Sequence, residues 1–131
     1  FFRKIARDRG AAIGRVSAQI KQFLADDASN GRLAAERELL ATALADVEAM
    51  IGTCFDHLLA SQEDPRRLYT VGLASVRLLM AFGDLMMGRR LLVGAEAARW
   101  FAANELPLIT ATRGIVAGLG NELMELDEAA F

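Results

Sequence analysis

The sequence has few of the residues on which protein chemistry usually depends. Its 131 residues include one cysteine and one histidine. A single cysteine, Cys54, excludes a disulfide within the chain and suits a reducing compartment. The histidine, His57, has no glutamate three positions before it, so the Glu-x-x-His pairs of a di-iron helical bundle are absent. With one histidine, no Ser-His-Asp or Cys-His constellation is indicated, and we expect no catalytic or metal-binding residue in this chain.

The chain also lacks a large excess of either charge and a long uninterrupted apolar run. The formal net charge of -2 gives no electrostatic reason to bind nucleic acid. The most apolar stretch is interrupted by Arg77, Asp84, Arg89 and Arg90, so we expect no membrane span. The first residues do not have the layout of a secretory signal peptide, and we expect a cytoplasmic protein. Because the chain opens with two aromatic residues and no initiator methionine, we also expect a piece of a larger protein.

Apolar residues at helical spacing are what the chain has in abundance. They make up 53% of the sequence and recur every three or four positions. Four helices are predicted, over about residues 2–25, 32–61, 65–92 and 95–126. Long helices with short connections are typical of an antiparallel bundle. The sequence therefore predicts an all-α fold: one up-down-up-down four-helix bundle over residues 1–131, with its last helix kinked near Pro107.

Apolar stripes predict the core of this bundle. The second helix carries the clearest one, a heptad-like seam at Leu40, Leu44, Val47, Ile51, Cys54 and Leu58. The first helix has its stripe at Ile13, Val16, Ile20 and Phe23, and the last helix at Leu108, Ile115, Leu119 and Leu123. Close helix packing is expected at five glycines, Gly10, Gly14, Gly114, Gly118 and Gly120.

Capping residues predict where the helices begin and end. Asp64 as N-cap with Pro65 at the first helical position is a strong start signal for the third helix. Gly94 is expected to close that helix in a left-handed conformation. Asn104 is a candidate N-cap that would place Pro107 in the first turn of a new helix.

The third predicted helix differs from the others because it is apolar on most of its circumference. Its apolar residues, which cannot all face one neighbour, are Val71, Leu78, Leu79, Phe82, Leu85 and Met86. Such a helix is central or is covered by another domain. Arg77 and Asp84 lie two turns apart, too far to pair with each other. Each is expected to pair across the bundle or with an absent domain, or to lie at the solvent edge.

Two pairs of adjacent aromatic residues are candidates for an interface: Phe1 with Phe2, and Trp100 with Phe101. Trp100 and Phe101 point about 100° apart on a helix, so one can anchor the core while the other faces a second helix or a partner. Together with the surplus apolar surface of the third helix, they predict that the isolated chain self-associates, most simply as a two-fold dimer. The alternative is that the bundle wraps the third helix completely.

Several stretches of the chain resemble one protein family. Residues 1–10, FFRKIARDRG, look like the segment that leaves the flavin-bearing helical domain of long-form bacterial acyl-CoA dehydrogenases of the 3-methylmercaptopropionyl-CoA dehydrogenase type. Residues 79–88 resemble that family's glycine-interrupted central helix. Residues 99–107, RWFAANELP, resemble its Arg-aromatic-Phe and Leu-Pro signature, and residues 121–126 its closing helix. The likeness covers nearly the whole chain and corresponds to the family's C-terminal extension.

The resemblance implies a non-catalytic C-terminal domain of an FAD-dependent enzyme of fatty acid metabolism, which removes hydrogen across the α–β bond of an acyl-CoA thioester. In that family FAD, the acyl-CoA and the catalytic glutamate belong to upstream domains, so no catalytic or cofactor-binding residue is carried over to this chain. The implied partners are the upstream catalytic domains of the same chain and further subunits of a homo-oligomer. The residues alone leave an alternative open, a stand-alone helical interaction or dimerisation module without enzymatic activity.

Overall fold

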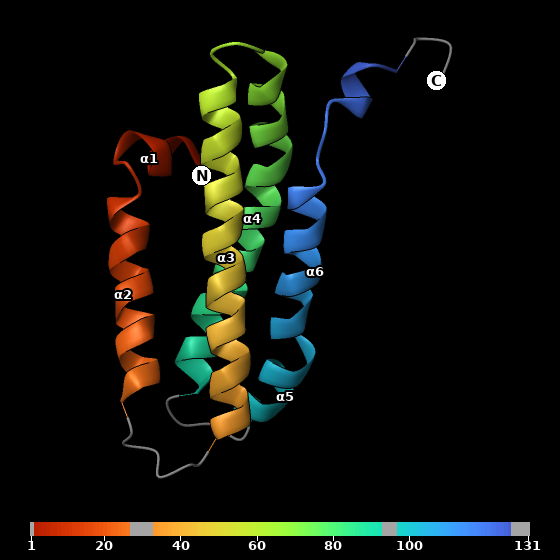
Figure 1. Cartoon of the computed structure of the whole chain (residues 1–131). Coiled ribbons are helices and arrows are strands. Elements are labelled where there is room, and N and C mark those ends of the chain that lie inside the picture. The colour runs from red at the N-terminus through yellow and green to blue at the C-terminus, as the bar shows by residue number, and fades with distance from the viewer. Residues whose placement is uncertain (1, 27–32, 93–96, 127–131) are drawn as a thin grey trace.

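The structure is a computed structural model that describes residues 2–26, 33–92 and 97–126 (Figure 1). These ranges contain no strand, so the prediction of an all-α fold is confirmed. Their elements are α1 (Phe2–Arg7), α2 (Ala11–Ala25), α3 (Ala34–Ala60), α4 (Arg66–Leu91), α5 (Ala97–Asn104), α6 (Leu106–Ala117) and the 3-10 turn η1 (Glu122–Met124).

Helix α3 is the centre of the arrangement. It packs most extensively against α4 and α6, while α5 contacts α3, α4 and α6. Helix α2 contacts α3, and Figure 1 shows α2 and α6 at opposite sides of the molecule. The chain alternates in direction through α2, α3, α4 and the α5–α6 pair (Figure 1). The largest side chains that are fully buried in the core include Ile20, Leu40, Val47, Met50, Leu78, Leu85, Leu106, Ile109 and Val116.

The predicted seam of the second helix is confirmed in α3. Its members are buried from Leu40 to Cys54, and Leu58 packs against the core while partly exposed. Cys54 is fully buried, as expected of a small core residue, and burial raises the pKa of its thiol to about 11. Such a thiol stays protonated and unreactive at neutral pH.

The first predicted helix is two helices, not one. Arg9 and Gly10 both have positive φ angles, 54° and 77°, which end α1 and turn the chain into α2. The Gly10 N–H donates to the Ile5 carbonyl, and the Arg9 N–H donates to the Ala6 carbonyl, which is the Schellman pattern of a helix end. The Asp8 carboxylate then accepts from the N–H groups of Gly10 and Ala12 at the start of α2.

The last predicted helix is also interrupted. Helix α5 ends at Asn104 and α6 begins at Leu106, with Pro107 in its first turn as predicted. Asn104 is not the N-cap, because its side chain donates to the Trp100 carbonyl within α5. Helix α6 ends at Ala117, and only η1 follows it, so the predicted continuation to residue 126 is wrong.

The apolar stripe predicted for the last helix is on the wrong face. Leu108 and Ile115 are about half exposed, whereas Leu106, Ile109 and Val116 are buried. The chain restarts its helix at Leu106, and this restart shifts which residues face the core. Of the other two predicted members, Leu119 packs partly against the core, and the side chain of Leu123 lies outside the described part.

Close helix packing occurs at a glycine other than those predicted. A Cβ atom on Gly10, Gly14 or Gly114 would meet nothing within 4 Å, and one on Gly118 would meet only backbone of its own helix. A Cβ on Gly88 would lie 2.9 Å from Leu106 Cδ2, so this glycine lets α6 approach α4.

Side-chain hydrogen bonds mark the start of α4 and the end of α2. Asp64 accepts from the N–H of Arg66 at 3.1 Å, so it caps α4 as predicted, although α4 begins one residue later, at Arg66. Arg37 of α3 reaches the end of α2, where its Nη2 donates to the carbonyl oxygens of Phe23, Leu24 and Asp26. The predicted first loop and the Gly94 cap fall outside the described residues, apart from Asp26.

Candidate functional site

Helix α4 has two apolar faces that lie on opposite sides. The inner face, defined here as Val71, Ala74, Leu78, Ala81 and Leu85, is buried against neighbouring helices. The outer face, defined here as Leu68, Tyr69, Val76, Leu79, Met80 and Met87, has side chains that are 46–67% exposed. A rotation of about 100° per residue puts the centres of these two sets nearly opposite each other.

The outer face is the candidate interaction surface of the chain. Single exposed apolar residues are ordinary, but six of them on one helix face form a continuous stripe, which is typical of a contact surface. Sequence analysis identified the helix and its surplus of apolar residues, but it did not identify the residues of the outer face. Those become evident only when it is known which side of α4 faces α3 and α6.

The four aromatic residues predicted at an interface lie in different environments. Phe1 is outside the described residues. Phe2 is buried, and its ring meets that of Phe55 edge to face with centroids 5.2 Å apart. Phe101 is half-buried against the core, while its neighbour Trp100 is 64% exposed. Of these four, Trp100 offers the largest described surface to a partner.

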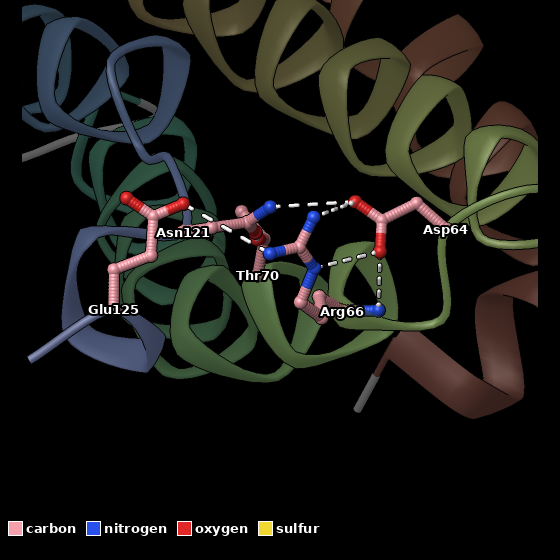
Figure 2. A network of polar contacts seen from close by, with 5 residues as sticks. All are labelled: Asp64, Arg66, Thr70, Asn121 and Glu125. Atoms are coloured by element: carbon pink, nitrogen blue, oxygen red, sulfur yellow. Dashed lines mark hydrogen bonds and ion pairs between the residues drawn. The ribbon is translucent and has the colours of Figure 1, made fainter.

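A polar network joins the start of α4 to the segment around η1, as Figure 2 shows. The Asn121 amide donates to Asp64 Oδ2 and accepts from Thr70 Oγ1, both at 3.4 Å. The Arg66 guanidinium lies 3.0 Å from Asp64 Oδ1 and 3.9 Å from Glu125 Oε1. The hydrogen bond from Arg66 lowers the pKa of Asp64. Each carboxylate is paired with the arginine, so the network holds the end of the described chain in place and has no free acid or base.

A second polar contact lies between α3 and α6. Asp46 is buried, and its carboxylate accepts from Thr110 Oγ1 and, at 2.9 Å, from Arg113 Nη1. A buried carboxylate with two donors is satisfied and holds the two helices in register.

The other titratable groups do not form a site. The described residues contain no group of three or more His, Cys, Asp or Glu placed to hold a metal ion. His57 is half-buried on α3. Arg77 is exposed, as expected of a residue at the solvent edge, and Asp84 is half-buried, where burial raises the pKa of its carboxyl.

A shallow groove of about 320 Å³ lies between α2 and α3. Small and apolar residues line most of it, and an ion pair of 2.8 Å between Lys21 Nζ and Glu48 Oε1 lies at its edge. The remaining lining residues are Gly10, Ile13, Gly14, Ser17, Ala18 and Ile51. Lys21 and Glu48, the charged residues that line the groove, are paired with each other. We therefore treat the outer face of α4, and not this groove, as the candidate site.

By length and composition α4 could also cross a membrane, and 33% of its most apolar 18-residue window is buried within the chain. The core helix of a soluble protein meets the same criterion. The inner face of α4 packs against the other helices here, so we treat its outer face as a surface for contact.

Comparisons with known proteins point to one family. The family model described as "Acetyl-CoA dehydrogenase C-terminal like" matches residues 16–99. The broad-specificity linear acyl-CoA dehydrogenase FadE5 of Mycobacterium tuberculosis is 46% identical over 154 aligned residues, which include the whole of this chain. The match covers 25% of that protein, so the chain spans about a quarter of the length of its curated relative.

Proposed function

The chain belongs to the acetyl-CoA dehydrogenase C-terminal-like family, and from this we propose that it is the non-catalytic C-terminal domain of an FAD-dependent acyl-CoA dehydrogenase. The single observation that carries the proposal is the 46% identity over the whole chain to one quarter of a linear acyl-CoA dehydrogenase. The resemblance of residues 1–10 and 99–107 to the long-form enzymes agrees with it.

We propose that FAD and the acyl-CoA substrate bind in the part of the enzyme upstream of this chain. Bound there, FAD would supply the oxidising chemistry of the α,β-dehydrogenation, which also needs a base for the α-proton. Neither that base nor a flavin ligand is assigned to this chain, where the ion pairs of Lys21 with Glu48 and of Asp46 with Arg113 join helices to one another.

The role proposed for the domain is packing. The outer face of α4 packs on the catalytic body or on a second subunit of a homo-oligomer, with Trp100 as an additional anchor. Within the enzyme, α2, α3, α4 and the α5–α6 pair would act as an up-and-down four-helix bundle whose last member changes direction near Pro107.

The stand-alone interaction module is the second candidate, because an exposed apolar face would suit it equally well. The two candidates differ in what precedes residue 1 in the natural protein. A flavin-domain sequence there supports the enzyme, and a start codon a few residues upstream supports the module.

One experiment tests the proposal directly. The full-length natural protein and the 131-residue chain are purified in parallel, and bound flavin and acyl-CoA oxidation are measured for both. We expect flavin and activity in the full-length protein alone. Stoichiometric FAD binding by the 131-residue chain, or a full-length protein without flavin or activity after FAD is supplied, would contradict it.

A further inference from the structure

Two glycines lie at the centre of the outer face of α4. Gly72 and Gly83 are exposed helix-interior residues, and a Cβ atom on either would meet nothing within 4 Å. Glycine in a helix interior lowers helix stability relative to alanine. Gly88 on the same helix has a reason within the chain, since Leu106 packs on it. Gly72 and Gly83 have no such neighbour among the residues that the structure describes, and their position allows the backbone of another helix to approach closely.

The charge of α4 limits what that other helix can be. Helix α4 carries five arginines, Arg66, Arg67, Arg77, Arg89 and Arg90, and one acidic residue, Asp84. Five arginines and one aspartate give α4 a net charge of +4, whereas the whole chain has a net charge of -2. Arg77 and Arg90 are exposed, and no ion-pair partner for either is found in residues 2–26, 33–92 or 97–126.

A second copy of α4 would occupy the outer face only weakly. An antiparallel pair would bring Arg66 and Arg67 of one copy toward Arg89 and Arg90 of the other, and a parallel pair would set each arginine near its equivalent. Like charges in such positions oppose pairing. An apolar helix flanked by aspartate or glutamate would fit both the apolar stripe and the arginines.

We propose that the outer face of α4 is the docking site for an acidic-flanked helix of the catalytic part of the same enzyme. Gly72 and Gly83 admit its backbone, the methionines adapt to its apolar side chains, and Arg77 and Arg90 pair with its carboxylates. The proposal rests on the proposed function, because the catalytic part supplies the helix.

The test uses the oxidation rates of two exposed methionines to detect whether the outer face is covered. Met80 and Met87 are 62% and 51% exposed, so dilute hydrogen peroxide should oxidise both in the 131-residue chain. In the flavin-loaded full-length enzyme, peptide mass spectrometry should show at least a tenfold slower oxidation at both positions. Met124 lies on η1, outside the outer face, and Met50 is fully buried, so they serve as exposed and buried references.

Two variants with matched controls identify the occupant. Gly83→Leu should restore rapid oxidation of Met80 in the full-length enzyme, and Gly52→Leu, at an exposed glycine of α3 that also has open space around it, should not. Arg90→Glu should weaken protection, while Arg15→Glu, at an exposed arginine of α2, should leave it unchanged. Flavin content is measured in every sample, since an absent flavin would indicate failure of the proposed function rather than of the docking site.

Three results would overturn the proposal. Met80 and Met87 could react as fast in the flavin-loaded enzyme as in the 131-residue chain, and binding of that enzyme to vesicles of anionic lipid would then assign the face to a membrane surface. The 131-residue chain could form a tight dimer, insensitive to salt, that Gly83→Leu abolishes, which would assign the face to a second copy. Protection could also persist in both Gly83→Leu and Arg90→Glu, which would place the contact elsewhere.

Discussion

The two faces of α4 are both apolar, yet they differ in almost every other respect. The inner face packs so closely that a methyl group on Gly88 would collide with Leu106, while Gly83, five residues earlier, has open space around it. Leu78 is fully buried and its neighbour Leu79 is 46% exposed. Packing against the other helices of this chain accounts for the apolar residues of the inner face but not for those of the outer face. We therefore assign the inner face to packing within this domain and, as proposed above, the outer face to a contact outside it.

Truncating the two adjacent leucines should give the largest difference between the faces. Leu78→Ala should lower the free energy of unfolding of the 131-residue chain by about 2–5 kcal/mol, because it removes buried surface and leaves a cavity. Leu79→Ala should change it by less than about 0.5 kcal/mol, since the side chain is half exposed. Urea unfolding of both variants measures this, and equal losses would mean that the faces are wrongly assigned.

Replacing Gly88 and Gly83 by alanine should change the free energy of unfolding in opposite directions. Gly88→Ala should destabilise the chain by about 1 kcal/mol, since Leu106 and Leu40 are fully buried and have little room to move. Gly83→Ala should stabilise it by up to about 1 kcal/mol, because alanine favours the helix and meets no neighbour. Thermal unfolding of the two variants, with Gly52→Ala as a further open-space control, checks the signs. A destabilising Gly83→Ala would show that this face already has a neighbour within the chain.

Asp84 lies at the boundary between the faces and should give a smaller effect that depends on pH. Burial raises the pKa of its carboxyl above the ordinary 3.8 in the folded chain. As pH rises from below 3.8, the unfolded state therefore loses its proton first, and stability falls until the folded-state pKa is passed. Asp84→Asn should remove this cost, so it should raise the melting temperature at pH 7 and have little effect below pH 3.8. A gain that is larger at the acidic pH would contradict this reasoning.

The sequence predicts a helix correctly where its apolar repeat continues over several turns or its capping residues are clear. The seam from Leu40 to Cys54 repeats through several turns, and Asp64-Pro65 is a strong helix start, so α3 and the beginning of α4 could be predicted closely. Prediction failed where a helix restarts. The break at Glu105 changed which residues of α6 face the core, and the Asp8-Arg9-Gly10 turn was available as a signal but was read as part of a helix.

The candidate surface was predictable only in part. Composition alone showed that one helix carries more apolar surface than one neighbour can cover. Which residues remain exposed depends on where α3 and α6 lie against α4, and this is tertiary information. The same holds for Phe2, whose burial against Phe55 depends on the turn that folds α1 back toward α3.

The central claim is that the outer face of α4 is made for contact, and the mass of the 131-residue chain in solution tests it most directly. Static light scattering over a concentration series should show a monomer that associates only weakly toward a two-fold dimer as concentration rises, because the isolated chain lacks the acidic-flanked helix proposed to cover the outer face. Because the arginines of α4 repel each other, added salt should strengthen this association. A Val76→Lys variant, which places a charge on the outer face, should remain monomeric. A monomer mass for the natural chain at every concentration up to the millimolar range, at low and high salt, would contradict the claim.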